Sequence, residues 1–332
     1  MNQARVLRLL LLTLVISVVA AVLVVMVSRS AWHVSLLSAT GPVASPAKPP
    51  APVEVPALAL PSLRPAQSSG DADPVLVGAG DIAGCDFDGD ETTAKLLDRI
   101  DGTVFTLGDN VYSSGTARQF KNCYEPTWGR HKVRTRPTPG NHDYRTDDAA
   151  PYFDYFGAAA GKPGEGYYSY EIGAWHVIAL NSNIDMDAGS AQVKWLRADL
   201  EAHPAACTLV YWHHPRWSSG VHGSDERLQA MWDTLYAVGV DVVLNGHDHN
   251  YERFAPQDPH GNADERAGIR QFVVGTGGKV ERGMGDPIAN SEVRNNGAFG
   301  VLKLVLRPTS YDWEFVPEPG STFADAGSGA CH

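Results

Sequence analysis

The chain has 332 residues, of which 43% are hydrophobic and 20% charged, so it can bury a core and is neither a coiled coil nor a wholly disordered chain. Its charge is uneven: residues 1–70 hold five basic residues and one acidic residue, whereas residues 71–332 hold 22 basic and 37 acidic residues, a formal net charge of −15. A body this acidic is a poor non-specific binder of nucleic acid or anionic lipid, so we expect no nucleic-acid partner.

The N-terminal region has the pattern of an export segment. Residues 9–27 carry no charge, with Arg5 and Arg8 before them and Arg29 after them. The stretch has the length of a membrane-spanning helix, roughly 17–25 residues, rather than of a signal-peptide core, about 7–15 residues. We therefore expect residues 1–30 to be a signal peptide or, in preference, an N-terminal membrane anchor. In both cases the body is predicted to be extracytoplasmic, either membrane-anchored or secreted.

Residues 31–73 are predicted to be a proline-rich linker. Nine prolines lie between residues 41 and 74, and Ala, Ser and Val fill much of the remainder without a helical period. Such a composition favours an extended polyproline-type spacer. The following residues, 74–332, are expected to form one domain.

Four cysteines, Cys85, Cys123, Cys207 and Cys331, all lie in the part that we expect to be exported. An even number of cysteines in an oxidising compartment predicts disulfides, and four cysteines allow three pairings. We expect Cys85–Cys123 and Cys207–Cys331, because a covalent bond would hold the C-terminal tail, which has little to bury. The wide spacing lacks the C-x-x-C pattern of a zinc knuckle.

Short apolar runs alternate with amphipathic segments along the body. Strands are expected at 75–79, 103–107, 136–139, 208–212, 240–244, 270–275, 300–307 and 311–316, an antiparallel hairpin at 167–171 and 175–181, and helices at 93–100, 192–202 and 227–238. Strands that alternate with helices, with polar residues at the strand ends, predict an α/β layered domain.

Five polar clusters follow the expected strands: 80–83 (Gly-Asp-Ile-Ala), 108–112 (Gly-Asp-Asn-Val-Tyr), 140–143 (Gly-Asn-His-Asp), 210–213 (Val-Tyr-Trp-His) and 246–249 (Gly-His-Asp-His). In four of them a glycine precedes a side chain that can bind a metal. The glycine permits a sharp turn, and the side chain then projects from the carboxyl edge of the sheet, where open α/β sheets place their sites. One such cluster is often an ordinary turn, but five in this order indicate a common site.

The clusters supply seven candidate metal ligands: Asp81, Asp109, Tyr112, Asn141, His213, His247 and His249. Seven donors are too many for one ion of four- to six-fold coordination and suit two ions that share a carboxylate. Oxygen and imidazole donors favour iron, zinc or manganese over calcium. Two adjacent ions can generate a bound hydroxide and neutralise the charge that develops in phosphoryl transfer.

The order GD-x, GD-x-x-Y, GNHD, V-x-x-H, GH-x-H resembles the calcineurin-like metallophosphoesterases and, within them, the purple acid phosphatases. The resemblance covers about residues 75–316 and implies a layered α/β sandwich of two mixed β-sheets flanked by helices. The tyrosine three residues after Asp109 distinguishes the purple acid phosphatases from their relatives, which generally have a histidine where this chain has Ala83. The first motif departs from the family pattern, since it reads GDIA rather than GDxG.

The resemblance also implies the distribution of the ligands. Asp81, Tyr112 and His249 would bind the first ion, expected to be Fe³⁺, and Asn141, His213 and His247 would bind the second, Zn²⁺, Fe²⁺ or Mn²⁺, with Asp109 bridging the two. A trivalent and a divalent ion together carry a charge of +5, and two carboxylates, a phenolate and a bridging hydroxide carry −4. The metal site as a whole would therefore have a charge of about +1. The site could therefore attract phosphate despite the acidic body, since bound ions dominate the local charge.

Three further residues are implied on the substrate side. His142 would bind the phosphate or protonate the leaving group, and His222, nine residues after His213, matches another substrate-side histidine of the family. Plant members have a second histidine where this chain has Gly223. Asp143 is expected either to orient His142 or to be a solvated carboxylate in a turn.

Two other features have more than one interpretation. His214 lies beside His213 and is the alternative ligand, but the V-x-x-H register favours His213. The segment 275–278 (Gly-Thr-Gly-Gly) resembles a phosphate-cradling loop, although it follows a late strand and lacks P-loop spacing. We interpret it as structural or as lining the site.

The leading functional prediction is an exported, acid-phosphatase-like enzyme that hydrolyses small phosphomonoesters by attack of a metal-bound hydroxide. A phosphodiesterase or nucleotidase of the same superfamily is the first alternative, because loops at 113–131, 144–166 and 217–226, not the metal ligands, would set this preference. A non-catalytic surface-binding protein is the remote alternative, which the presence of all seven ligands disfavours. The N-terminal segment, if uncleaved, would bind the membrane. The sequence does not indicate the oligomeric state.

Overall fold

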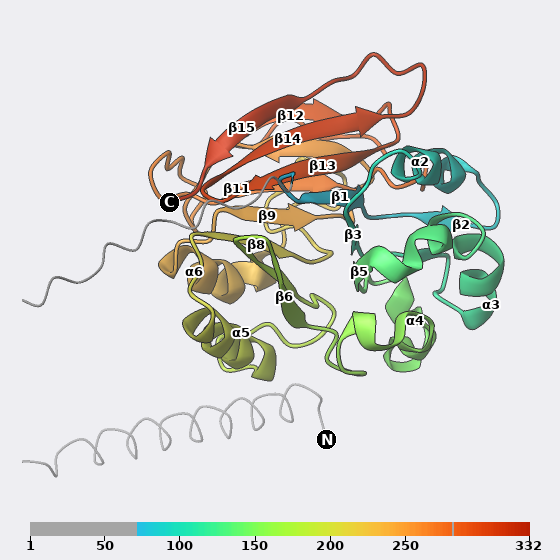
Figure 1. The fold of residues 1–332 in the computed structure, drawn as a ribbon, viewed down its shortest axis with the longest axis horizontal. Helices are drawn as coiled ribbons and strands as arrows, with labels where there is room; N and C mark the ends of the chain where they lie inside the picture. Colours follow the sequence, from blue (N-terminus) through green and yellow to red (C-terminus); the bar gives the residue numbers. More distant parts are fainter. Residues whose placement is uncertain (1–71, 281) are drawn as a thin grey trace, which may run out of the picture. The chain divides into compact units, whose positions relative to one another are not determined.

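The computed structural model describes residues 72–280 and 282–332 of the chain. The expected signal peptide or anchor at 1–30 and nearly all of the linker at 31–73 lie outside the described residues. The described part belongs to one compact unit, residues 68–332 (Figure 1). Within that part, no helix has the length and hydrophobicity that crossing a membrane requires.

Most strands belong to two mixed sheets. The strands are β1 Val75–Ala79, β2 Ala83–Gly84, β3 Thr103–Leu107, β4 Val111–Tyr112, β5 Thr135–Thr138, β6 Tyr168–Ile172, β7 Trp175–Ala179, β8 Cys207–Tyr211, β9 Val242–Asn245, β10 Tyr251–Phe254, β11 Arg270–Val274, β12 Ser291–Asn295, β13 Gly300–Arg307, β14 Ser310–Pro317 and β15 Ala326–Ala330. One sheet has the order β15-β14-β13-β1-β3-β5 and the other the order β12-β10-β11-β9-β8-β7-β6. Strands β2 and β4 form a small parallel pair.

Each sheet contains a run of adjacent parallel strands. Strands β1, β3 and β5 run in the same direction in the six-stranded sheet, and β7, β8 and β9 do so in the seven-stranded sheet. The C-terminal strands β13, β14 and β15 extend the first sheet by antiparallel pairing. The predicted hairpin is present as β6 and β7. Parallel strands end at the same edge of a sheet, so the loops that follow them are gathered there.

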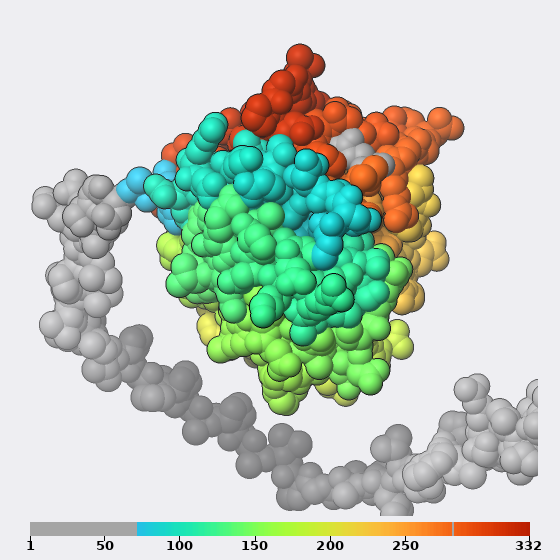
Figure 2. All heavy atoms as spheres, turned by 90° about the vertical axis from the view of Figure 1, so that its right-hand side faces the viewer, coloured from blue at the N-terminus to red at the C-terminus, as the bar shows by residue number. Residues whose placement is uncertain are grey.

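Helices cover the sheets. The α-helices are α2 Gly89–Leu97, α3 Ala117–Gln119, α4 Ala150–Phe156, α5 Ala191–Ala202 and α6 Gln229–Ala237. Short helical turns are η1 Phe120–Tyr124, η2 Trp128–Arg134, η3 Asp143–Arg145, η4 Asp147–Ala149, η5 Gly157–Ala160 and η6 Glu226–Leu228. Figure 1 shows α5 and α6 together beside the seven-stranded sheet, and Figure 2 shows the face that the chain between β1 and β6 forms.

The main core lies between the two sheets. Aromatic rings from opposite sheets meet there: Phe105 lies 6.0 Å from Tyr211, and Phe272 lies 5.7 Å from Trp313, between ring centroids. A second apolar cluster joins the other face of the seven-stranded sheet to α5 and α6 through residues such as Trp232. The expected sandwich of two mixed sheets flanked by helices is therefore confirmed.

Several elements differ from the sequence prediction. The helix expected at 93–100 begins four residues earlier, at Gly89, where Asp90 and Glu91 occupy the first turn and interact favourably with the helix dipole. Strands β10, β12 and β15 were not predicted. In β15, Gly327 and Gly329 lie against the rings of Trp313 and Tyr311, where a Cβ atom would overlap the rings, so the strand lacks the side-chain alternation that reveals a strand in sequence.

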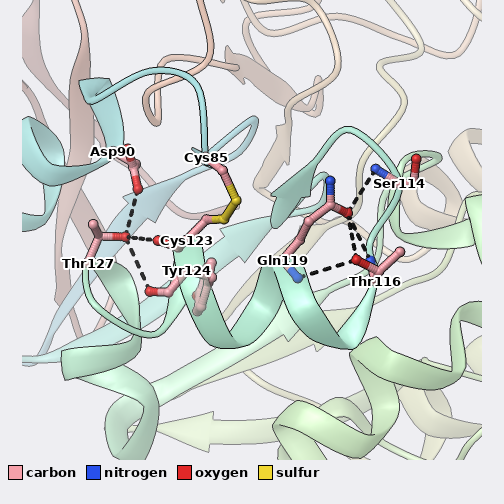
Figure 3. The surroundings of a disulfide bond; sticks show 8 residues. All are labelled: Cys85, Asp90, Ser114, Thr116, Gln119, Cys123, Tyr124 and Thr127. Carbon is pink, nitrogen blue, oxygen red and sulfur yellow. Dashed lines mark hydrogen bonds between the residues drawn. A yellow bond between two sulfur atoms is a disulfide. The ribbon is translucent and has the colours of Figure 1, made fainter.

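Both disulfides have the expected pairing. Cys85 is bonded to Cys123, with Cα atoms 5.1 Å apart, and Cys207 to Cys331, with Cα atoms 5.4 Å apart. The first bond joins the chain after β2 to η1 (Figure 3). The second joins the start of β8 to the residue that follows β15, so the C-terminal tail is attached to the opposite sheet.

Candidate metal centre

The seven predicted ligands converge at the edge where the central strands end. Asp81 follows β1, Asp109 follows β3, Tyr112 lies in β4, Asn141 follows β5, His213 follows β8, and His247 and His249 follow β9. The two sheets meet at this edge, where the amide of Gly80 donates a hydrogen bond of 2.8 Å to the carbonyl of Val274. Five segments from both sheets thus deliver their side chains to one place.

Three of these ligands have an unusual backbone. Asp81, Asp109 and His247 adopt left-handed conformations, with φ of 60°, 49° and 73°. Such conformations cost residues other than glycine of order 1–3 kcal/mol each, and they concentrate at functional sites. Gly140 permits the loop after β5 to approach, because a Cβ atom there would overlap the amide and carboxylate of Asp109. These backbone conformations direct the ligand side chains toward one another.

Tyr112 lies at the centre of one group of donors. Its hydroxyl lies 2.7 Å from Oδ1 of Asp81, 2.9 Å from Oδ2 of Asp109 and 3.2 Å from Nε2 of His249. All four side chains are almost completely buried. Three oxygens and one nitrogen therefore share a space that excludes bulk water.

His213 and His249 direct Nε2 toward the other donors, because a backbone carbonyl holds Nδ1 of each ring. Nδ1 of His213 lies 2.7 Å from the carbonyl of Leu107, and Nδ1 of His249 lies 2.9 Å from the carbonyl of Val280. When Nδ1 donates to a carbonyl, Nε2 is left with a lone pair, which is the usual arrangement of a metal-binding histidine. Nε2 of His213 lies 3.0 Å from Oδ1 of Asn141 and 3.2 Å from Nδ1 of His247.

The buried acidic groups of the site would be stabilised as anions by a positive charge. Burial raises the pKa of Asp81 to about 7, and burial together with Asp109 and Asp81 raises the pKa of Tyr112 well above its usual value. Burial lowers the pKa of His213, but the Asp109 carboxylate and its hydrogen bond outweigh this effect and raise it to about 9, so a metal ion at Nε2 would displace a proton from this ring. Burial lowers the pKa of His249 to about 4, so that ring is neutral. Because a multivalent cation would hold the carboxylates and the phenolate as anions, this donor set fits metal ions.

His142 lies beside the metal donors. Its ring is 4.4 Å from that of Tyr112, between centroids, and its Nδ1 lies 2.7 Å from the carbonyl of Ser113. Its Nε2 lies 3.9 Å from Oδ2 of Asp109, and its backbone amide donates to Oδ1 of the same carboxylate at 2.7 Å. With Nδ1 fixed by a carbonyl, Nε2 is the nitrogen directed toward the donors.

His222 lies on the opposite flank. Its ring centroid is 4.3 Å from that of His247, and its Nε2 lies 2.9 Å from the guanidinium of Arg282. Its amide donates a hydrogen bond of 2.9 Å to Oδ1 of Asp248, a buried carboxylate between two of the predicted ligands. Asp248 also accepts from Ser218 at 2.5 Å, so it attaches the loop 218–222 to the turn after β9.

Asp143 does not take one of the two expected arrangements. It is buried, and one oxygen accepts hydrogen bonds from the amides of Gly140 and Asn110 and from the Asn110 side chain, at 2.9–3.2 Å. These interactions do not include the His142 ring. The expectation that Asp143 lies in solvent is therefore wrong, whereas its orienting of His142 stays a prediction. Asp143 joins the loop that carries Asn141 to the loop that carries Asp109.

The neighbouring His214 has a different partner for Nδ1, although it offers a ring nitrogen within 4.8 Å of those of His213 and His247. Nδ1 of His214 lies 2.7 Å from the hydroxyl of Ser182, while His213 faces Asn141. The V-x-x-H register thus identifies the histidine that faces the other donors. The His214 ring still lies 4.4 Å from that of His247, between centroids, and supports it.

Sequence reasoning missed Lys279, Arg282 and Asp248. Lys279 places its ammonium 5.0 Å from the Tyr112 ring centroid, and Arg282 contacts His222 as described above. A lysine directly after the Gly-Thr-Gly-Gly segment was the available signal for Lys279. Asp248 could have been noticed as the residue enclosed by His247 and His249. Nothing in the local sequence distinguished Arg282.

One of two cavities in this region is lined by site residues. One, of about 350 Å³, is lined by His214, His222 and His247 together with the segments 215 and 223–225 and Arg227. The larger, of about 660 Å³, lies beside the disulfide shown in Figure 3 and is lined by Phe87, Asp90, Ser114 and Gln119, among others. The smaller cavity is the one that reaches the predicted ligands themselves.

Comparison with known proteins agrees with this geometry. The family model of the calcineurin-like phosphoesterases matches residues 75–251, which is more than half of the chain and contains all seven predicted ligands. The chain belongs to the calcineurin-like phosphoesterase family.

Plant purple acid phosphatases are among its relatives. Purple acid phosphatase 18 of Arabidopsis thaliana is 35% identical over 230 residues, 63% of this chain and 52% of the relative. Purple acid phosphatase 15 of the same plant is 27% identical over 240 residues, 61% of this chain and 44% of the relative. The chain thus spans about half the length of the curated relatives that it matches.

Two solved structures share the fold. Purple acid phosphatase PPD1 from yellow lupin (Lupinus luteus) has a TM-score of 0.63 at 18% identity, over 79% of this chain and 54% of the lupin chain. GAP50, the anchor in the inner membrane complex of Plasmodium, has a TM-score of 0.63 at 16% identity, over 79% of this chain and 90% of its own. At these identities the likeness concerns the fold alone.

Proposed function

We propose that this protein is a binuclear-metal phosphoesterase that hydrolyses small phosphomonoesters outside the cytoplasm. The observation that carries the proposal is the position of Tyr112, whose hydroxyl lies within 3.2 Å of Asp81, Asp109 and His249. A phenol in that place resembles the purple acid phosphatases rather than the family in general. The similarity to the plant enzymes supports the same assignment.

Seven side chains would hold two ions. Asp81, Tyr112 and His249 are assigned to an Fe³⁺ ion, and Asn141, His213 and His247 to a Zn²⁺, Fe²⁺ or Mn²⁺ ion, with Asp109 shared. Anionic oxygens gather on the first group, which suits a trivalent ion, whereas the second group contains two imidazoles and an amide, which suit a divalent ion. When bound, such a pair activates water and neutralises negative charge on a phosphoryl group.

The residues beside the metal donors are assigned different roles. In its doubly protonated form, His142 would donate the proton of Nε2 to the oxygen of the leaving group and become neutral, while the Ser113 carbonyl holds its Nδ1–H. His222 would bind the phosphate oxygens from the His247 side. Asp143 and Asp248 are assigned as positioning residues, since each accepts hydrogen bonds from the loops that carry the functional side chains.

Two disulfides support a location outside the cytoplasm. Disulfides persist in oxidising compartments and are rare in the cytosol. Cys85–Cys123 and Cys207–Cys331 account for all the cysteines of the chain. Together with the uncharged N-terminal stretch, they are consistent with export by a cleaved signal or by an uncleaved anchor.

Hydrolysis of a matched pair of chromogenic esters tests the proposal. The metal-loaded protein should release 4-nitrophenol from 4-nitrophenyl phosphate far faster than from bis(4-nitrophenyl) phosphate. Asp109→Asn should abolish the release, whereas substitution of His260, an exposed histidine away from the site, should not. Faster hydrolysis of the diester would establish the phosphodiesterase alternative, and hydrolysis of neither ester would favour a binding protein.

A further inference from the structure

A second group of side chains that can bind a metal lies at the edge of the seven-stranded sheet opposite the predicted ligands. His176 lies near the start of β7 and pairs with Thr208 near the start of β8, whereas the predicted ligand His213 follows the end of β8. Asp199 lies in the last turn of α5, and His203 follows that helix directly. One donor atom from each of His176, Asp199 and His203 lies within 4.8 Å of those of the other two. Three donors from a strand and a helix end thus meet at one place.

His176 lies between two carboxylates. Its Nδ1 lies 2.7 Å from Oε1 of Glu171 on the neighbouring strand β6, and its Nε2 lies 2.8 Å from Oδ2 of Asp199. The side chains of His176 and Asp199 are only 1% and 7% exposed. A neutral imidazole donates from one nitrogen alone, so one carboxylate would face a lone pair unless a second proton or a metal ion is present. A histidine that donates its other N–H to a carboxylate is the usual form of a metal ligand.

His203 makes a metal ion the better of these two cations. Its Nδ1 lies 2.9 Å from the carbonyl of Asp199, one turn earlier, so a ring that donates to this carbonyl keeps a lone pair at Nε2. The ring stacks on that of His176, with centroids 5.1 Å apart and planes at 15°. A proton on His176 uses one lone pair, whereas a metal ion can accept a lone pair from both rings. Because the His203 side chain is 50% exposed, its ring can turn toward the ion.

The end of α5 favours a cation as well. The carbonyl groups at the C-terminus of a helix carry a partial negative charge, and the last turn of α5 contains no basic residue. The hydroxyl of Ser169 donates a hydrogen bond of 2.8 Å to Oδ1 of Asp199. Oδ2, which faces His176, is therefore the oxygen left for the ion.

We propose that His176, Asp199 and His203 bind a divalent transition-metal ion, such as Zn²⁺, at a site separate from the binuclear centre. Two imidazoles and a carboxylate are donors that zinc prefers, and water would complete the coordination. Glu171 is assigned as the positioning residue that holds Nδ1–H of His176. The ion would join β7 to the end of α5 and, since it binds only the folded chain, would stabilise the fold. This inference does not depend on the proposed phosphoesterase function.

The test measures zinc binding by the full chain after the binuclear centre has been loaded. Bound Zn²⁺ per chain is determined by equilibrium dialysis, its affinity by calorimetric titration, and the unfolding temperature with and without added zinc. His203→Gln removes a ligand at an exposed position, where the fold should tolerate the change, and Asp199→Asn removes the charge of a second ligand. His260→Gln, which changes an exposed histidine in the loop 256–268, is the matched control.

The wild type and the control should bind about one further Zn²⁺ per chain and unfold at a higher temperature when zinc is added. His203→Gln and Asp199→Asn should lose both effects and keep the wild-type rate of ester hydrolysis. Glu171→Gln should weaken zinc binding by about 10- to 100-fold, the usual effect of losing a carboxylate behind a metal-binding histidine. Equal zinc binding by wild type and His203→Gln, or an equal loss in the control, would overturn the inference. The comparison of wild type with His203→Gln decides it even if the protein hydrolyses no ester.

Discussion

The hydroxyl of Tyr112, in β4, lies 2.7 Å from the carboxylate of Asp81, after β1, although the two residues are 31 positions apart in sequence. Burial raises the pKa of both groups, to about 7 for Asp81 and well above the usual value for Tyr112. Two acidic groups are therefore held together where neither ionises easily. A trivalent cation between them would favour both anions, which is the physical reason for assigning Fe³⁺ to this side of the site.

Tyr112→Phe tests that assignment by colour. A phenolate bound to ferric iron absorbs visible light by charge transfer, so protein from iron-supplemented culture should be pink to violet. The substitution removes the donor oxygen and keeps the ring, and it should abolish the band while Asp81, Asp109 and His249 retain some iron. The visible spectrum and the iron content are recorded together. Iron-containing wild type without the band, or a band that survives the substitution, would refute a tyrosinate ligand.

Asp109→Ala should reduce metal binding more than the loss of any other single ligand. Asp109 contacts residues of both donor groups, with Tyr112 at 2.9 Å from one oxygen and His213 at 3.5 Å from the other. Its removal deprives both ions of a donor, whereas Asn141→Ala affects only one. Metal per chain is measured for the two variants under identical loading. Equal loading, with turnover retained in Asp109→Ala, would disprove the shared position of Asp109.

His142→Ala should leave metal content unchanged and lower turnover by ~10²–10⁴-fold, the usual contribution of a general acid. The loss should be greatest for esters with poor leaving groups, since these depend most on a proton from Nε2. Rates are measured over a series of aryl and alkyl phosphates that spans a wide range of leaving-group pKa. A loss that is uniform across the series would show that His142 binds phosphate and donates no proton.

Asp90 should make the stability of the domain depend on pH. Its side chain is 2% exposed and accepts a hydrogen bond of 2.8 Å from Thr127 (Figure 3). Burial raises its pKa from 3.8 to about 6, so the folded protein binds its proton more tightly than the unfolded chain does. The stability from this group is complete below about pH 4 and is lost as the pH rises through 6, by on the order of 2–3 kcal/mol at most.

Comparison with Asp90→Asn isolates this effect. The difference in unfolding free energy between wild type and variant should change in favour of the variant between pH 4 and pH 7, because the amide cannot ionise. Asp86→Asn, at an exposed position nearby, provides the control and should show no such trend. A difference that is constant across this pH range would mean that Asp90 ionises normally in the folded protein.

Much of the site could be predicted because each ligand is encoded locally. Asp81, Asp109 and Asn141 follow a strand and a glycine, and parallel strands bring such positions to one edge whatever the rest of the chain does. The pairing of the cysteines was also predicted. These inferences needed only the order of the elements, not the paths of the loops.

The features that the sequence did not predict depend on the paths of the loops. Arg282 lies after β11, and a backbone hydrogen bond from its amide to the carbonyl of His249 helps to place it, which no periodicity reveals. Asp143 has the sequence context of a solvated turn, yet Gly140 and Asn110 enclose it. The glycine-rich sequence of β15 does not indicate a strand. Two aromatic rings occupy the space where side chains of Gly327 and Gly329 would otherwise lie. In each case tertiary contacts, not local sequence, determine the structure.

The central claim, a phosphoesterase that needs two metal ions, is tested most directly by titrating metal into the metal-free protein while phosphate release from 4-nitrophenyl phosphate is followed. Seven converging donors with one shared carboxylate predict that the rate rises until about two equivalents of metal per chain are bound and then remains constant. A plateau at one equivalent, or no release at any metal concentration, would contradict the account.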